Sequence, residues 1–343
     1  MRPIPEGTGR AFPLRDWGSA VNEISKLSPQ ANSGGGPGLL VRLFGLASQE
    51  AHFSRRGFAA GPAQPLLERI GESFICGCNL GLEGRHEFPS ALRRHPVVLR
   101  GFVAEGAAMG AATRSVLLPW RDDLGVMLAA LKDEYVYLAH VGVGWAMARL
   151  PFARRRLWRA LDPLLAPLAF DGWGFHDGYF NPRRTIGGGL PAGEALRRAA
   201  YDQGVGRSLW FVHCANPARI QDAISSADQS RSSDLWSGVG LAAAYAGGLE
   251  ERQLDLLAAG AGSSRPWLAQ GAAFGIEAHA RAGVVPAHAS LAALRLCGTS
   301  AASLSALVLS ARDEAVGRFG AAPAAYGAWR RNVAETLSVR GPR

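Results

Sequence analysis

The stretch 171–180 reads Asp-Gly-Trp-Gly-Phe-His-Asp-Gly-Tyr-Phe and gathers two carboxylates, one histidine and four aromatic rings within ten residues. On a helix, Trp173, His176 and Asp177 share one face, because residues three and four positions apart are neighbours. A carboxylate beside a histidine raises the basicity of the imidazole, which suits general acid or base catalysis. We therefore predict Asp171, His176 and Asp177 as catalytic residues. The predicted walls of an aromatic substrate cavity include Trp173, Phe175 and Tyr179.

A second set of polar residues stands before glycines that recur along the chain. The set comprises Glu105, Asp171, Gln203, Ser237 and Gln270, with His140 one residue further back. On helices of one phase these groups form a row, which is either a site or a set of ties between helices, since buried polar groups need partners. We predict Glu105 as a fourth catalytic residue. The further predicted substrate-binding residues are His140, Trp145, Asp202, Gln203, Arg207, Trp210, Trp236, Gln270 and Phe274.

The glycines predict the elements that position these groups. Seven short segments, each with a glycine followed by small or apolar residues, recur between residues 69 and 283. Their glycines at 71, 106, 142, 172, 204, 238 and 271 stand about 33 residues apart. A period of this size is typical of stacked two-helix units. We therefore predict an all-α fold of two-helix repeats, stacked as a solenoid or an α/α barrel.

Glycine inside a helix costs about 1 kcal/mol relative to alanine, so its recurrence at one phase indicates close packing between helices. The clearest unit is 217–248. Apolar residues spaced i, i+3, i+4 and i+7 predict a first helix over 219–227. Asp234 is the predicted N-cap of a second helix over 235–246, which ends at Gly247 and Gly248.

The repeat predicts one helical domain over residues 39–335, because a solenoid grows without dividing. The proline-rich and glycine-rich residues 1–38 are a predicted flexible lead-in, residues 336–343 a predicted tail, and 181–193 a predicted long loop. We expect a cytoplasmic protein without a membrane span, since neither a signal peptide nor a long apolar run is recognisable. We predict neither a cofactor nor a metal site, because Cys76 and Cys78 lack a second pair with the spacing of zinc ligands.

The chain carries 37 basic and 28 acidic residues, a formal net charge of +9 that comes mainly from arginine. A cluster at Arg154, Arg155, Arg156 and Arg159 is either a solvated face or a surface that attracts an acidic partner. Nucleic acid is not expected as that partner, because no recognisable nucleic-acid-binding module is present.

Five strings, taken in order, resemble the DUF1702 family. They are Arg-Arg-Gly-Phe at 55–58, Arg-Gly-Phe-Val-Ala-Glu-Gly-Ala-Ala-Met at 100–109, the stretch 171–180, Asp-Gln-Gly-Val-Gly-Arg-Ser-Leu-Trp-Phe at 202–211 and Asp-Leu-Trp-Ser-Gly-Val-Gly-Leu-Ala at 234–242. Members of that family are encoded in bacterial enediyne and related polyketide clusters. The resemblance implies a pathway, natural-product biosynthesis, and no particular catalytic residue.

Residues and resemblance together lead to three expectations of function. The first is an enzyme that binds a hydrophobic polyene or isoprenoid small molecule in an aromatic cavity and promotes its cyclisation or rearrangement by acid/base chemistry. The second is a non-catalytic helical scaffold that binds an acidic acyl carrier protein or a sister biosynthetic enzyme. The third is an enzyme similar to isoprenoid (terpene) cyclases, although the aspartate-rich metal motifs usual in the class I type are missing.

Overall fold

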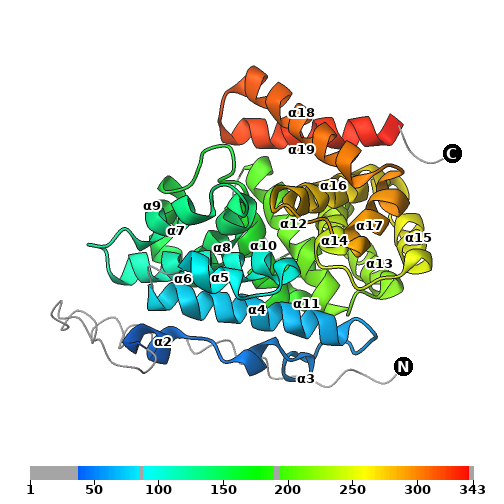
Figure 1. Cartoon of the computed structure of the whole chain (residues 1–343). Helices are drawn as coiled ribbons and strands as arrows, with labels where there is room; N and C mark the ends of the chain where they lie inside the picture. Colours follow the sequence, from blue (N-terminus) through cyan, green and yellow to red (C-terminus); the bar gives the residue numbers. More distant parts are fainter. Residues whose placement is uncertain (1–37, 85–87, 189–193, 340–343) are drawn as a thin grey trace.

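The computed structural model describes residues 38–84, 88–188 and 194–339. Every regular element in these ranges is helical, which confirms the predicted all-α class (Figure 1). The predicted lead-in lies outside the described residues except for Gly38. The predicted tail begins inside a helix, because the last helix continues to Val339.

Seven long helices form the framework of the molecule, and we call them the glycine helices. They are α4 (Gln64–Glu83), α6 (Arg100–Leu117), α8 (Val136–Arg149), α10 (Leu168–Phe180), α12 (Ala195–Val212), α14 (Ser232–Tyr245) and α16 (Arg265–Arg281). Each packs against the next in this order. The seven segments that contain the recurring glycines are therefore neighbouring helices, in the order of the chain from α4 to α16.

Glycine pairs explain why consecutive helices lie so close. In α10, Gly172 faces the backbone of α8, and Gly174 faces the backbone of α12. A Cβ atom at Gly172 would lie 2.8 Å from the carbonyl carbon of Val141, a separation that real side chains essentially never show. Paired glycines of α8, α12 and α14 follow the same plan, the first facing the preceding helix and the second facing the following one. The helix propensity lost at each glycine is therefore compensated by backbone contact on both sides.

The first glycine helix departs from the predicted pattern. Gly77 and Gly81, rather than Gly71, face the next helix, at Val103 and Ala107 of α6. Gly71 faces Ala51 on the other side, where an added Cβ would lie 2.8 Å from the alanine methyl. The recurring glycine of this unit therefore packs against the N-terminal segment that precedes α4.

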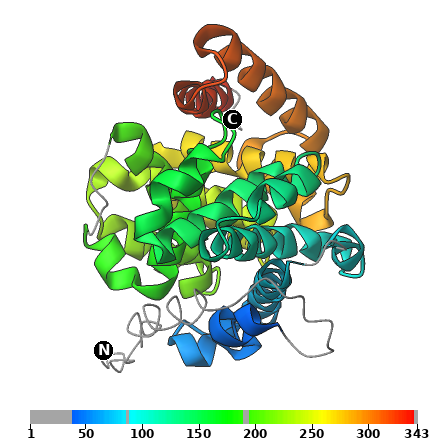
Figure 2. The ribbon, with the colours of Figure 1, turned by 90° about the vertical axis from the view of Figure 1, so that its left-hand side faces the viewer.

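Shorter helices follow the glycine helices along the chain, one after each. They are α5 (Phe88–Arg93), α7 (Asp123–Leu131), α9 (Arg154–Arg159), α11 (Pro182–Ile186), α13 (Pro217–Ser225), α15 (Glu251–Gly260) and α17 (Ala287–Cys297), with 3-10 turns η3 (Val97–Leu99), η4 (Pro151–Ala153), η5 (Gln229–Arg231) and η6 (Gly262–Ser264). Among them α13 packs against α15, and α15 against α17, which gives this part of the molecule a second layer. Figure 2 shows the first described helices, in blue, and the last two, in orange and red, on opposite sides of the glycine helices.

The unit 217–248 forms its two predicted helices, α13 and α14. The cap differs, because α14 begins at Ser232 and Asp234 lies in its first turn, where it accepts a hydrogen bond from Arg330. Gly247 and Gly248 take positive φ values of 72° and 104°, as a glycine helix end requires. The predicted loop at 181–193 begins as helix α11, since Pro182 occupies a first-turn position that proline favours.

Both ends of the described chain cover the glycine helices. The N-terminal segment holds α2 (Leu39–Phe44), η2 (Ser48–Ala51) and α3 (Phe53–Arg56), and lies along α4. The C-terminal pair α18 (Ala301–Phe319) and α19 (Pro323–Val339) packs on α16 (Figure 1). In the described residues no single helix is long and apolar enough to cross a membrane, and only α17 joined to α18 across a 69° bend has that length and composition.

Candidate functional site

A cavity with largely aromatic walls lies between the N-terminal segment and six of the glycine helices, α4 to α14. It encloses about 830 Å³ of space between atoms, its opening to solvent included. Rings of Phe74, Trp145, Phe175 and Tyr179 form much of its wall, with Trp145 at 4.6 Å from Phe74 and 5.2 Å from Phe175 between ring centroids. We call this space the first cavity. Its lining suits an apolar ligand.

Charged groups interrupt this apolar wall, and Glu105 and Arg207 are buried, whereas Glu50, Arg56 and Arg149 are partly exposed. Arg207 of α12 forms an ion pair with Asp171 of α10 and lies 3.5 Å from Oε2 of Glu105 on α6. All three side chains are almost completely buried, and we call them the central ion cluster. Glu105 and Arg207 line the first cavity, whereas Asp171 lies on the far side of Arg207. The cluster therefore places a carboxyl group at the edge of an apolar binding space.

The two carboxyl groups of this cluster, Glu105 and Asp171, compete for one guanidinium group, that of Arg207. Asp171 receives the closer donors, Arg207 and the side-chain amide of Gln203 at 2.7 Å. Glu105 accepts from the indole N–H of Trp145 at 3.1 Å. Burial raises the pKa of the Glu105 carboxyl, Arg207 opposes that rise, and the charge of Asp171 adds to it. Glu105 is thus the member of the cluster suited to hold a proton and to donate it.

The predicted polar row exists as a chain of contacts across consecutive helices. The side-chain amide of Gln203 donates a hydrogen bond to Asp171. Ser237 Oγ lies 3.2 Å from Gln203 Oε1 and 2.8 Å from Gln270 Oε1. The single hydroxyl proton of Ser237 serves one of these oxygens at a time. Gln270 Nε2 is buried without a hydrogen-bond partner in the described part of the chain. Glu105 joins the row through Arg207, so five of the six aligned groups come together.

His140, the sixth group, lies apart from this row. Its Nδ1 is 2.7 Å from the Val136 carbonyl oxygen, and its Nε2 accepts from the backbone N–H of Asp162 at 3.2 Å. Burial lowers the pKa of this imidazole, which keeps the ring neutral. His140 therefore ties α8 to the segment before α10 and lines neither of the two cavities described here.

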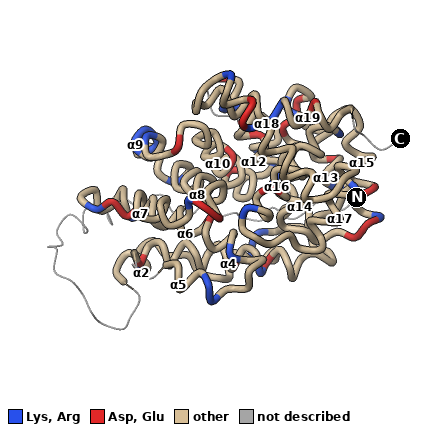
Figure 3. The backbone as a smooth tube through the Cα atoms, turned by 45° about the horizontal axis from the view of Figure 1, so that its top comes forward, with Lys and Arg blue, Asp and Glu red and all other residues tan. Residues whose placement is uncertain are grey.

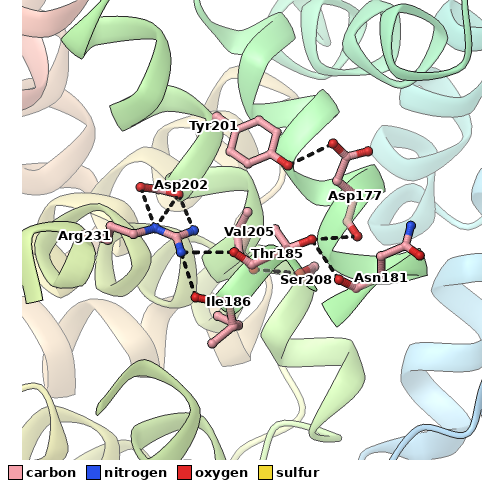
Figure 4. A network of polar contacts seen from close by, with 9 residues as sticks. All are labelled: Asp177, Asn181, Thr185, Ile186, Tyr201, Asp202, Val205, Ser208 and Arg231. Atoms are coloured by element: carbon pink, nitrogen blue, oxygen red, sulfur yellow. Dashed lines mark hydrogen bonds and ion pairs between the residues drawn. The ribbon is translucent and has the colours of Figure 1, made fainter. Parts of the chain in front are cut away.

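His176 and Asp177 come together as predicted, but only the histidine lines the first cavity. His176 Nδ1 is 3.0 Å from Asp177 Oδ1. Figure 4 shows the second contact of Asp177, whose Oδ2 accepts from the Tyr201 hydroxyl at 2.8 Å. Burial lowers the pKa of His176, although the Asp177 carboxylate opposes that change. With Nδ1–H directed at Asp177, the neutral ring has its lone pair on Nε2. Asp177 is thus placed to orient His176.

Several predicted substrate-binding residues lie elsewhere. Trp173 faces away from the first cavity and stacks under the Arg154 guanidinium, 3.7 Å from its ring centre. Trp210 is fully buried and donates to the Gly247 carbonyl oxygen at 3.0 Å, and Trp236 is buried outside both cavities. Trp145, Phe175, Tyr179 and Arg207 do line the first cavity.

Asp202 belongs to a separate buried network (Figure 4). Arg231 donates to its carboxylate at 2.7 Å, and to the carbonyl oxygens of Thr185 and Ile186 at 3.0 and 2.9 Å. This arginine therefore fixes α11 against α12 and η5. The network lies outside both cavities, which makes Asp202 a structural residue in this arrangement.

A second, smaller cavity lies on the other side of the central ion cluster and encloses about 510 Å³. Asp171 and Phe274 line it, together with residues of α18 and α19. Sequence reasoning missed the groups that join distant helices, above all Tyr245, which lines both cavities. It also missed Arg149 in the first cavity, although an arginine four residues after Trp145 on an apolar helix is a usable signal. No group of three or more His, Cys, Asp or Glu side chains in the described ranges has an arrangement that holds a metal ion.

Comparison with known proteins gives one match. The family model described as "Protein of unknown function (DUF1702)" matches residues 38–337, nearly the whole chain. No curated protein and no solved structure gave a significant match. The match covers the glycine helices, both cavities and the central ion cluster. The chain therefore belongs to the DUF1702 family.

Proposed function

We propose that the protein binds a polyunsaturated hydrophobic small molecule, a polyene or an isoprenoid, in the first cavity and promotes its cyclisation or rearrangement by proton transfer. The observation that carries this proposal is Glu105, a buried carboxyl group with a raised pKa at the edge of an aromatic cavity. Such an acid is poised to donate a proton to a ligand bound in that cavity.

The reaction that this arrangement suits begins with proton transfer from Glu105 to a carbon–carbon double bond. The π electrons form the new C–H bond, the adjacent carbon becomes a cation, and Glu105 becomes a carboxylate next to Arg207. Rings of Trp145 and Phe175 offer their faces to the cation. A second double bond then closes a ring, and the resulting cation loses a proton to Glu105 or to Nε2 of His176. Protons and electrons balance without an oxidant, in a cyclisation or an isomerisation.

Two further points support this proposal. The resemblance to the DUF1702 family, whose members are encoded in enediyne and polyketide clusters, favours an unsaturated, hydrophobic substrate in natural-product biosynthesis. The first cavity draws its lining from α4 through α14, so we also infer that the glycine helices curve around it as an α/α barrel. Arg207 is already held by Asp171 and Glu105, which argues against its use as a diphosphate ligand.

Replacement of Glu105 tests the proposal. Glu105→Gln nearly preserves shape but removes the transferable proton, so product should fall by at least about 100-fold, the usual contribution of a general acid. The readout is mass spectrometry of metabolites from a gene-deletion strain complemented with each variant. Purified protein should still bind a fluorescent polyene such as parinaric acid, with quenching of the tryptophan emission to which Trp145 contributes.

Asp234→Asn is the matched control. It also removes a carboxylate that is paired with a buried arginine, Arg330, but it lies outside both cavities. Product should therefore persist in this variant. Full complementation by a folded Glu105→Gln protein would refute the proton-transfer step, and failure of the wild-type protein to bind any apolar polyene would refute the cavity as its site.

One observation supports a second candidate, docking of an acidic acyl carrier protein. Arg155, Arg156 and Arg159 are exposed on α9 and form no ion pair with any acidic group in the described ranges. Figure 3 shows their positive charge gathered on this short helix. Binding of a purified carrier protein should weaken in Arg155→Glu with Arg156→Glu, and salt should weaken the wild-type complex. Unchanged affinity in that double variant would exclude α9 as the docking helix.

A further inference from the structure

Three side chains separate the first cavity from the second. Arg207, Leu241 and Tyr245 line both spaces, and we call them the partition. Arg207 comes from α12, and the other two come from successive turns of α14. Only the thickness of these side chains therefore divides one apolar space from the other.

The three members of the partition are held very differently. Arg207 is fixed by its ion pair with Asp171 and by Glu105. The Tyr245 ring stacks on His279 with centroids 4.3 Å apart and meets the edge of Phe102 at 5.1 Å. Leu241 packs only through apolar contacts and is incompletely buried, although it lies between the two cavities. An isobutyl group with free space on both sides can change rotamer at little energetic cost. Leu241 is thus the movable part of the partition.

The second cavity is largely apolar, although Asp171 and Glu277 also line it. Leu138, Val141 and Phe274 contribute to its wall, and Val308, Tyr326 and Trp329 line it from the C-terminal pair α18 and α19. Trp329 is fixed by donation from its indole N–H to the Val308 carbonyl oxygen at 2.8 Å. The predominantly apolar wall of this cavity suits the end of a hydrocarbon chain.

We propose that the two cavities form a single binding tract for one elongated apolar chain, and that Leu241 sets how far the chain reaches. The reactive double bonds lie in the first cavity beside Glu105, and the far end of a long chain passes Leu241 into the second cavity. This inference rests on the proposed binding of an apolar ligand in the first cavity, and it does not depend on proton transfer by Glu105. It assigns to α18 and α19 the role of closing the distal end of the tract.

Chain-length profiles test this proposal. The probe is the neutral dye N-phenyl-1-naphthylamine, displaced from the purified full-length protein by straight-chain alcohols from octanol to hexadecanol. Affinity should rise about fourfold for each added methylene group that becomes buried, the factor that corresponds to about 0.8 kcal/mol. In the wild-type protein this rise should continue to longer alcohols than the first cavity alone can hold.

Two variants block the second cavity from different sides. Leu241→Phe thickens the partition, and Ala278→Phe fills the second cavity from α16, where Ala278 lines it. Ala278→Phe should bind short alcohols as the wild-type protein does, because Ala278 does not line the first cavity, and both variants should reach a plateau at the same shorter chain length. Leu241→Ala should tighten binding of the longest alcohols alone. Circular dichroism and thermal melting confirm that each variant is folded, and the two independent blocks keep the test valid if one of them is not.

The outcomes separate this inference from the function proposed above. Displacement in every protein with identical length profiles would overturn the single tract and leave binding in the first cavity intact. Absence of dye binding in the wild-type protein would overturn both. If the chain-length profiles of the variants differ from that of the wild-type protein, and Glu105→Gln gives the wild-type yield of product, the single tract is supported. The proton-transfer step is then refuted.

Discussion

The packing of α10 against α12 can be tested at a single glycine. A Cβ atom added at Gly204 would lie 2.7 Å from the backbone nitrogen of Phe175, and closer still to the carbonyl oxygen of Asp171. Ordinary van der Waals contact begins near 3.4 Å, so the two backbones would have to separate by at least 0.7 Å, which is 3.4 minus 2.7. No flexible side chain is available to absorb this shift, because both obstacles are backbone atoms.

The expected cost follows from two opposing effects. Overpacking of this kind costs about 1 to 3 kcal/mol and more when it is rigid, while alanine returns about 1 kcal/mol of helix propensity. Since the clash is with backbone, we expect Gly204→Ala to lower the free energy of unfolding by about 2 kcal/mol or more. The shift would also move Asp171 away from Arg207 and Gln203, because the clashing carbonyl belongs to Asp171 itself.

Gly317→Ala is the matched control, since Gly317 lies within α18 and an added Cβ there would meet nothing within 4 Å. The same chemical change should therefore stabilise the protein, by up to about 1 kcal/mol. Urea denaturation followed by circular dichroism measures both variants under one condition. A Gly204→Ala protein as stable as the wild type would refute backbone contact between α10 and α12.

Two further predictions concern buried charge. The pKa of Glu105 is raised in the folded protein, so the native state holds more protons than the unfolded state at pH values between the unfolded and the folded pKa. Glu105 therefore stabilises the folded protein below its unfolded pKa, and this stabilisation is lost as pH rises through the folded pKa. Urea titrations between about pH 4 and pH 7 measure the free energy of unfolding of Glu105→Gln and of the wild type. The value for Glu105→Gln should increase relative to the value for the wild type as pH increases, and a difference that does not change with pH would contradict the raised pKa. Arg231→Met should cost about 3 to 5 kcal/mol by leaving the buried Asp202 carboxylate unpaired. Adding Asp202→Asn should recover part of that loss in the same assay, whereas additive losses would show that the two residues do not interact.

The sequence was sufficient to predict which helices meet, because each contact depends on one residue type at one position. A glycine at 142, 172, 204 or 238 permits backbone contact whatever the surrounding side chains do, so the repeat alone identifies neighbours. The residues directly before Gly172, Gly204, Gly238 and Gly271 then occupy equivalent places, which is why Asp171, Gln203, Ser237 and Gln270 were found as a row.

What the sequence did not reveal depends on side-chain direction and on contacts between distant helices. Trp173 satisfied the predicted spacing with His176 but is turned towards Arg154, because helix spacing leaves a broad face open to several rotamers. Asp202 and Gln203 are adjacent in sequence, yet one bonds Arg231 and the other bonds Asp171. Tyr245 reaches Phe102 across helices that are far apart in the chain, and no local pattern indicates such a contact.

Close helix packing and the polar centre of the site depend on one another. Ser237 has one of the shortest polar side chains, yet its hydroxyl lies within 3.2 Å of two glutamine side chains from the two neighbouring helices. It can reach both because Gly238 and Gly271 let α12, α14 and α16 approach to backbone contact. At the wider spacing of ordinary helix pairs, about 8 to 10 Å between axes, longer polar side chains would be needed and would project into the cavities. The glycine repeat therefore allows short polar side chains to connect the helices by hydrogen bonds. The space beside Glu105 and Arg207 then remains available for apolar side chains and for a ligand.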